Sequence, residues 1–302
     1  MKNQSEAQKK HDSYLWFLAA AQRGNAYAQF NLALMFKKGQ GAARDDAKAF
    51  MWMHRAAEQG LAFAQNHLGA MYYHGRGTEA SDVEAVHWFR CAALQGEGSA
   101  QQNLGQMYKR GRGVPVSSEM ALNWFFRAAE QGVASAQTLL GEAYAHGDGA
   151  NRSWPLALAW FRKAALQGDA TAQLNLGLMH KHALGVAQND ARALEWFRQA
   201  AALGEPGAQR LLGLAYVEGR GAPVDLARGY AWLARAAEQE DAEAQFHLAG
   251  MLVQGKGVER DEELAYIWYR RAAEAGHPQA RRQLARLSAR RRGARASGSG
   301  AL

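Results

Sequence analysis

Apolar residues recur with helical spacing along almost the whole chain. Between residues 62 and 74, the side chains of Ala64, Leu68, Met71 and Tyr72 follow an i, i+4, i+7, i+8 stripe. This stripe predicts an amphipathic helix. Sustained alternation of period two is missing and β-branched residues are few, so the pattern predicts no strands. We therefore expect an all-α protein.

A second helix is expected after each such stripe, and we name the two helices of a unit helix A and helix B. Residues 75–77 read Gly-Arg-Gly, and glycine closes a helix because it tolerates the left-handed conformation. Helix B then carries Trp88 and Phe89 with the small pair Ala92-Ala93, and ends at Gly96. A hydrogen-bond acceptor at the start of helix B stabilises it by roughly 1 kcal/mol. The units place there Asp45, Ser81, Ser117, Ser153, Asn189, Asp225 and Asp261.

The two-helix unit repeats every 36 residues without insertion or deletion. Eight tryptophans keep this interval: Trp16, Trp52, Trp88, Trp124, Trp160, Trp196, Trp232 and Trp268. The glycines that end helix B also keep it, at Gly24, Gly60, Gly96, Gly132, Gly168, Gly204 and Gly276. One helix pair cannot bury its apolar faces alone, so successive pairs are expected to stack into a solenoid with nearest-neighbour contacts.

The repeat also sets the expected boundaries. We expect a polar N-terminal segment or cap at Lys2–Ser13 and a first helix B over about residues 10–23. Units of helix A and helix B should start near residues 24, 60, 96, 132, 168, 204 and 240, before a last helix A over about 277–288. Residues 1–288 would then form one solenoid of about eight helix pairs.

These units resemble Sel1-like repeats, the 36-residue relatives of tetratricopeptide repeats. The resemblance rests on Ala64-Gln65, on the run from Leu68-Gly69 to Gly77, and on the run from Trp88-Phe89 to Gly96, with similar strings over about residues 10–288. It implies a right-handed α/α superhelix. Members of that family are mostly non-enzymatic adaptors in bacteria and eukaryotes, so the resemblance implies an adaptor in signalling, regulation or complex assembly.

Several positions depart from this pattern. Ala183 replaces the first loop glycine, His180 replaces the tyrosine, and Glu240 replaces the glycine that ends helix B. The last unit has Arg291 and Gly293 in place of Gly-x-Gly. These departures bear on the local loop geometry and leave the expected fold unchanged.

The positive charge is concentrated near the C-terminus. The formal net charge is +8, and residues 281–302 hold seven arginines and no acidic residue, which leaves +1 for the rest of the chain. Residues 289–302 cannot bury apolar area, so we expect a basic disordered tail. The tail is either a solubilising terminus or a weak, salt-sensitive contact for nucleic acid or another acidic surface.

The residues that could carry chemistry form no recognised constellation. The lone cysteine, Cys91, excludes an intramolecular disulfide, and His87 one helical turn away is its nearest candidate base. His74, His146 and His182 share a repeat position, yet no acidic partner repeats beside them. We expect no catalytic residue, metal or cofactor. A cell-wall-related or β-lactam hydrolase is a weaker alternative implied by the resemblance.

The location of the protein is also bounded by its apolar runs. The longest run near the start, residues 14–21, is far shorter than the roughly 20 residues of a membrane span. The leader before it is long and polar, which makes a poor signal peptide. We expect a cytoplasmic protein without a membrane segment, with a monomer favoured, and the composition suggests a bacterial source.

The variable positions of helix A are the candidate contact sites. The repeated Ala, Gln and Leu should face the stack, whereas positions at spacing i, i+3, i+7, i+10 differ between units. Exposed aromatic side chains and arginines anchor many interfaces, so we expect a peptide or partner protein on the concave helix A surface. The candidates are Tyr27, Phe30, Leu34, Lys37, Phe63, Asn66, Tyr73, Gln102, Gln106, Lys109, Glu142 and Arg210. Alternatively, Tyr27, Phe30 and Leu34 pack under the N-terminal segment as a cap.

Overall fold

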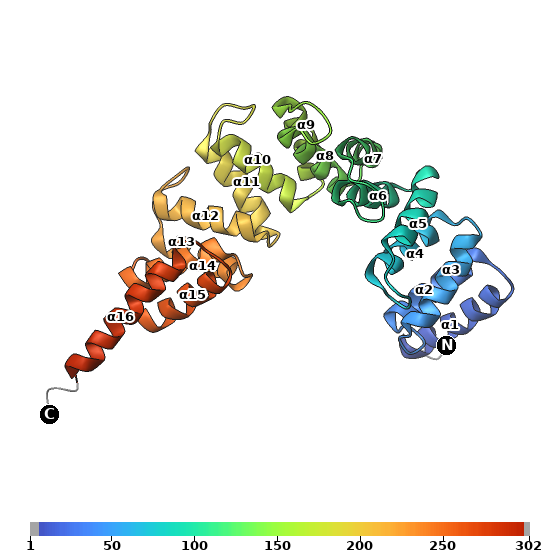
Figure 1. Cartoon of the computed structure of the whole chain (residues 1–302), viewed down its shortest axis with the longest axis horizontal. Helices are drawn as coiled ribbons and strands as arrows, with labels where there is room; N and C mark the ends of the chain where they lie inside the picture. The colour runs from blue at the N-terminus through green and yellow to red at the C-terminus, as the bar shows by residue number, and fades with distance from the viewer. Residues whose placement is uncertain (1–5, 299–302) are drawn as a thin grey trace, which may run out of the picture. The chain divides into compact units, whose positions relative to one another are not determined.

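The computed structural model describes residues 6–298, apart from the side chains of residue 7 and of residues 291–298. All regular secondary structure in this range is helical, as the sequence predicts, and Figure 1 shows the helices in order along the chain. Odd numbers are B helices and even numbers are A helices. The helices are α1 (Glu6–Gln22), α2 (Ala26–Lys38), α3 (Asp46–Glu58), α4 (Ala62–His74), α5 (Asp82–Leu94), α6 (Gly98–Arg110), α7 (Ser118–Glu130), α8 (Ala134–His146), α9 (Trp154–Leu166), α10 (Ala170–Lys181), α11 (Asp190–Ala202), α12 (Pro206–Glu218), α13 (Leu226–Glu238), α14 (Ala242–Gln254), α15 (Glu262–Glu274) and α16 (Ala280–Gly298).

The helices group into two compact parts, Met1–Ala157 and Leu158–Leu302, with the boundary inside α9. Each part holds several two-helix repeats, and the two parts are called the N-terminal unit and the C-terminal unit below. Within each unit, the helices pack on their neighbours in sequence. In the N-terminal unit one apolar cluster runs through α1 to α4, and another joins α5 and α6 to α7. In the C-terminal unit the clusters join α11 to α12 and α13 to α16. Each core therefore extends through neighbouring helices, as expected for a repeat solenoid.

Small residues set how closely the two helices of a unit approach. Ala92 and Ala93 of α5 are completely buried, and Gly69 of α4 faces the ring of Phe89. A β-carbon at Gly69 would lie 2.7 Å from Phe89 Cδ1. Replacing this glycine would therefore force α4 and α5 apart.

The Gly-x-Gly loop has two separate structural tasks. Gly75 ends α4 in the left-handed conformation, with φ of +64°, and its N–H bonds back to the last turn of the helix. Gly77, with φ of +72°, lies against the backbone carbonyl of Asp46 in the preceding helix B, where a β-carbon would clash. The first glycine closes helix A and the second lets the loop touch the previous repeat.

All seven predicted helix B caps form. Each side chain accepts a hydrogen bond from the backbone N–H three residues further on, over 2.8–3.4 Å. The capping residues are Asp45, Ser81, Ser117, Ser153, Asn189, Asp225 and Asp261. These bonds satisfy donors in the first turn that have no partner within the helix.

Five of the eight repeated tryptophans lie against a cationic side chain of their own helix. Trp52, Trp124 and Trp160 are buried, whereas Trp88, Trp196, Trp232 and Trp268 are half-buried. A guanidinium or ammonium group lies 3.9–5.0 Å from the ring centre of five of them, supplied by Arg55, Arg127, Lys163, Arg235 and Arg271. Cys91 occupies the same repeat position beside Trp88, so that unit lacks the cation–π contact.

Two units keep the loop conformation without glycine. Ala183 and Glu240 adopt φ of +55° and +67°, in the region that glycine occupies in the other units. A residue with a β-carbon pays roughly 1 kcal/mol or more to adopt this conformation. The sequence departures thus leave the loop path in place and store strain locally.

The two ends of the chain differ from the expected boundaries. α1 begins at Glu6, so residues 6–13 of the expected N-terminal segment belong to the first helix B, and residues 2–5 lie outside the described range. α16 runs to Gly298, so the backbone of residues 289–298 is helical where the sequence predicts a disordered tail. Alanine and arginine are strong helix formers, and no proline interrupts this stretch. Residues 299–302 lie outside the described range.

Candidate functional site

Helix A separates its repeated positions from its variable ones. In α4 the repeated side chains Ala64, Gln65 and Leu68 are buried, with 0%, 6% and 0% of their surface exposed. The variable Phe63 is 58% exposed, and Tyr27 at the same repeat position of α2 is 66% exposed. One face of helix A therefore builds the core while the other remains open to a partner.

A pocket of about 220 Å³ lies between α4 and α6 of the N-terminal unit. Ala70, Phe89 and Met107 supply its apolar wall, while Tyr73, Gln102, Gln106, Asn103, His74 and Arg110 supply its polar groups. Tyr73, Gln102 and Gln106 are three of the residues predicted as contact positions. Neighbouring A helices thus bring together variable positions that lie one repeat apart.

Hydrogen bonds between repeats order the polar side of this pocket. Asn103 Nδ2 donates to Asn66 Oδ1 over 2.9 Å, and the Ser135 hydroxyl donates to Gln102 Oε1 over 2.6 Å. Within the described range, the amide of Gln106 forms no hydrogen bond. The pocket therefore offers amide groups with unused donors and acceptors.

A cation and an acid hold the Tyr73 ring at the edge of the pocket. The guanidinium of Arg112 lies 4.0 Å from the centre of that ring and forms an ion pair of 2.7 Å with Asp82. The hydrogen bond to Asp82 raises the pKa of Arg112 above its ordinary value. Arg110 Nη1 donates to the Tyr73 hydroxyl over 3.2 Å, and no ion pair in the described range involves Arg110. The pocket keeps one uncompensated cation.

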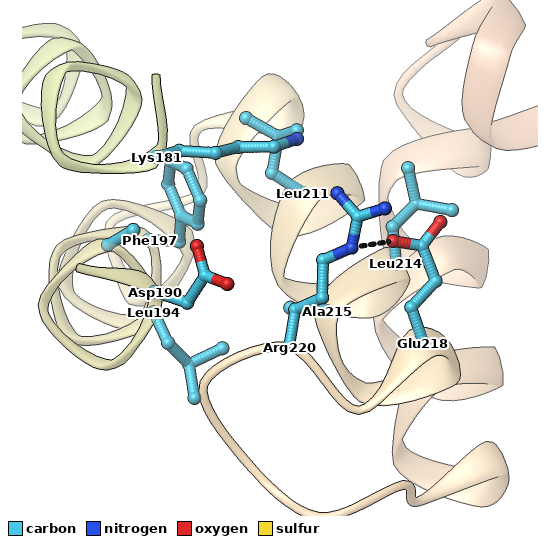
Figure 2. Close-up of a pocket in the computed structure, with 10 residues that line it drawn as sticks. Lys181, Asp190, Leu194, Phe197, Leu211, Leu214, Ala215, Glu218 and Arg220 are labelled. Carbon is cyan, nitrogen blue, oxygen red and sulfur yellow. Dashed lines mark ion pairs between the residues drawn. The ribbon is translucent and has the colours of Figure 1, made fainter. Parts of the chain in front are cut away.

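A second pocket, of about 90 Å³, lies among α10, α11 and α12 of the C-terminal unit (Figure 2). Phe197, Leu194 and Leu211 line its apolar side, together with Ala193, Leu214 and Ala215. Its charged groups are Lys181, Asp190, Glu218 and Arg220. Figure 2 shows the guanidinium of Arg220 directed toward Glu218, with 2.9 Å between Nε and the carboxylate.

The two pockets use the same repeat positions with different charges. Lys181 stands at the repeat position of Tyr73, and Glu218 stands at that of Arg110. Arg220 and Asp190 repeat Arg112 and Asp82. Lysine cannot hold a guanidinium as the Tyr73 ring does, and Arg220 pairs with Glu218. The C-terminal pocket therefore balances two cations with two acids, whereas the N-terminal pocket carries a net positive charge.

The predicted contact residues of the first helix A lie in different surroundings. Leu34 lines a groove against α1, beside Lys9, Ser13 and Phe17. The ring of Phe30 lies 5.5 Å from the ring of His67 in α4. Tyr27 is exposed. The cap and the binding surface both stay predictions for these three residues.

The remaining candidates are not all free to bind. Arg210 forms a half-buried ion pair of 3.0 Å with Asp241, so its charge is already used between α12 and α14. Lys37 is half-buried and Lys109 is exposed. Glu142 in α8 is half-buried. Lys37 and Lys109 are therefore the predicted cations best placed to meet a ligand.

Cysteine and histidine side chains form no evident reaction centre in the described part of the chain. Cys91 Sγ lies 3.9 Å from His87 Nε2 on α5, and neither lines the two pockets above. Within residues 6–298, no cluster of three His, Cys, Asp or Glu side chains could hold a metal ion. None of the described helices is both long enough and apolar enough to cross a membrane.

Comparison with known families decides the identity of the repeat. The Sel1 repeat model matches seven consecutive segments: residues 26–61, 62–97, 98–133, 134–169, 170–205, 206–241 and 242–277. The chain belongs to the Sel1 repeat family. The Sel1 fold typically serves protein–protein interaction, and the family is generally non-catalytic.

Solved structures of other Sel1 repeat proteins are similar over nearly the full chain. The Escherichia coli protein c5321, described as a protective antigen of uropathogenic strains, is 38% identical over 91% of this chain, with a TM-score of 0.80. This chain spans 59% of the c5321 chain. A Sel1 repeat protein from Oxalobacter formigenes is 33% identical, with a TM-score of 0.77. The match covers 94% of this chain and 83% of the Oxalobacter formigenes chain. No curated protein matches the sequence.

Proposed function

We propose that this Sel1 repeat protein is a non-enzymatic scaffold that binds a peptide or a partner protein on its helix A face. The observation that carries the proposal is the pocket between α4 and α6, where the variable Tyr73, Gln102 and Gln106 of two neighbouring repeats surround an apolar wall that includes the repeated Phe89 and Met107. Repeated positions of the same helices are buried in the core. The surface that differs between units is therefore the surface that remains available.

The chemistry of this face suits a polypeptide ligand. Exposed aromatic rings at Tyr27 and Phe63 offer large contact area, and such residues are frequent anchors of interfaces. The amides of Gln102 and Gln106 can donate to carbonyl groups and accept from N–H groups of a peptide backbone. An extended or helical peptide lying across α2, α4 and α6 would use both kinds of group.

The test is a peptide selection followed by point variants. A display library of peptides of about a dozen residues is selected on the purified chain, and the affinity of a recovered peptide is measured by fluorescence anisotropy. Phe63→Ala and Tyr73→Arg should each weaken binding about tenfold, because each removes an aromatic contact worth roughly 1.4 kcal/mol. Circular dichroism should show unchanged helicity.

The matched control is Leu94→Ala, which removes an exposed apolar side chain from helix B of the same unit. Its affinity should equal that of the unaltered chain. The proposal fails if the library yields no binder, or if both helix A variants retain full affinity.

A further inference from the structure

Three A helices of the N-terminal unit have an unusual charge distribution. α2, α4 and α6 contain no acidic residue, and their last turns hold Lys37, Lys38, His74, Lys109 and Arg110. The nearby Asp46 and Asp82 lie on B helices and pair with Arg44 and Arg112. The face formed by α2, α4 and α6 is therefore cationic and aromatic, whereas α8 of the same unit carries Glu142.

The cations of this face form no ion pairs with neighbouring carboxylates. Across the described residues, no ion pair involves Lys37, Lys109 or Arg110. Burial lowers the pKa of Lys37 most, Arg76 and Lys38 act in the same direction, and Asp46 opposes them. Burial, followed by Lys37 and Lys38, also lowers the pKa of His67. The neighbouring cations repel one another, and a bound anion would reduce that repulsion.

Two A helices of the C-terminal unit, α12 and α14, provide an internal comparison. They carry Glu218 at the position of Arg110 and Glu243 at the position of Phe63. Arg220 pairs with Glu218, and Arg210 pairs with Asp241. The same repeat thus forms with its cations paired at α12, so the bare cations of α2 and α6 are not needed to form it.

We propose that the face formed by α2, α4 and α6 binds an acidic peptide segment that also carries apolar side chains. This inference rests on the proposed function and adds the chemistry of the partner. Carboxylates of the peptide pair with Arg110 and Lys109. An apolar side chain enters the pocket lined by Ala70, Phe89 and Met107, and its backbone meets the amide of Gln106.

A peptide fits this face better than a nucleic acid for two reasons. The pocket has an apolar wall and a volume of about 220 Å³, which accepts an aliphatic side chain. The cations Lys37, Lys38, Lys109 and Arg110 sit in the last turns of α2 and α6, at the C-terminal ends of these helices, whereas a nucleic-acid strand is bound by cations that follow its backbone along a groove. Nucleic acid binding is therefore an outcome for the test to exclude.

The experiment uses the full chain and three labelled peptides that differ only in charge. The first repeats the unit Glu-Glu-Leu, and in the other two glutamine or lysine replaces every glutamate. In fluorescence anisotropy, the glutamate peptide should bind at least about tenfold more tightly than the glutamine peptide, and rising salt should weaken it. The lysine peptide should not bind.

Two variants assign the binding to this face. Arg110→Glu introduces the charge that Glu218 carries at the same repeat position. It should lower the affinity for the glutamate peptide at least about tenfold, with unchanged helicity. Arg110→Lys should keep most of the affinity. The control Arg198→Glu makes the same charge change on an exposed residue of helix B in α11, and it should leave the affinity unchanged.

The outcomes separate this inference from the proposed function. Equal affinity for the glutamate and glutamine peptides, or an Arg110→Glu variant that binds as the unaltered chain does, overturns the acidic partner and leaves peptide binding in place. Tighter, Arg110-dependent binding of a single-stranded DNA of about a dozen nucleotides also overturns it. Absence of any peptide binding on this face, including by selected peptides, removes the proposed function itself.

Discussion

His180 is a buried histidine in α10. Other repeats carry a tyrosine at its position: Tyr72, Tyr108, Tyr144 and Tyr216. His180 is 5% exposed, and its Nδ1 atom has no hydrogen-bond partner in the described range. Burial lowers the pKa of His180, and the nearby Arg192 and Arg162 act in the same direction. A hydrogen bond with the backbone of Ala187 opposes this shift. The fold therefore favours the neutral imidazole.

This residue makes stability depend on pH. Because the folded state binds the proton less readily than the unfolded state, stability is full above the ordinary histidine pKa of about 6.5 and falls as the pH drops below it. His180→Tyr should reduce the loss of stability between about pH 7.5 and about pH 5.5, measured by urea unfolding at both values. His67 shares the lowered pKa, so part of the loss should remain.

The control for this prediction is His146→Tyr, which changes an exposed histidine at a neighbouring repeat position. It should leave the acid sensitivity as it is. Identical acid sensitivity in His180→Tyr and the unaltered chain would show that the buried imidazole does not contribute.

At the same residue scale, the sequence predicted contact residues but could not give the pairings between their side chains. The variable spacing of helix A pointed to Tyr73, Gln102 and Gln106, which line one pocket. Spacing could not show that Arg112 would lie over Tyr73 and pair with Asp82, because the pair joins residues 30 positions apart in sequence through the contact between repeats. Nor could it show that Arg210 is held by Asp241.

Helices are joined by a ladder of buried glutamines. In each described case, the helix A glutamine donates to a carbonyl at the end of the preceding helix B, as Gln65 does to Ala57 over 3.2 Å. Its own Oε1 then accepts from a glutamine at the end of the next helix B, as Gln65 does from Gln95 over 2.7 Å. The Ala-Gln pair recurring in the sequence thus marks a hydrogen-bonded link between three successive helices.

Two rungs of this ladder are broken. Leu203 and Ala275 replace the second glutamine, and the Oε1 atoms of Gln173 and Gln245 are buried without a partner. Leu203→Gln should supply the missing donor and raise the free energy of unfolding by about 1 kcal/mol. Urea unfolding monitored by circular dichroism measures this effect.

Leu94→Gln is the matched control, since it also replaces an exposed leucine near the end of a helix B but faces no orphaned oxygen. If Leu203→Gln gains no more stability than this control, the orphaned oxygen of Gln173 costs the fold nothing measurable.

At the element scale the sequence predicted most of the architecture. Periodicity placed α4 at residues 62–74, and the Asp, Asn and Ser caps marked the start of every helix B in the middle of the chain. The ends were less predictable, because in the described range α1 packs mainly on α2 and α16 on α15, so local propensity has more weight in their boundaries. The same reasoning explains why α16 extends past residue 288.

On the scale of the whole molecule, the repeat acts as a constant frame for variable chemistry. Buried alanine, leucine, glutamine and glycine positions keep each helix pair in the same form, and they recur in all seven segments that the Sel1 repeat model matches, apart from single substitutions. The exposed positions of helix A are cationic and aromatic in α2, α4 and α6, whereas the cations at α12 are paired with acidic residues. A scaffold with this division can bind different partners along its length without altering its core.

The central claim is that helix A, and not helix B, supplies the binding surface. Site-specific photocrosslinking tests it most directly, with benzoylphenylalanine placed at Phe63 or Gln106 on helix A, and at Leu94 or Arg90 on helix B. With a peptide selected on the unaltered chain, we predict efficient crosslinks from the two helix A positions and none from the two helix B positions. Crosslinks from helix B alone would contradict the account.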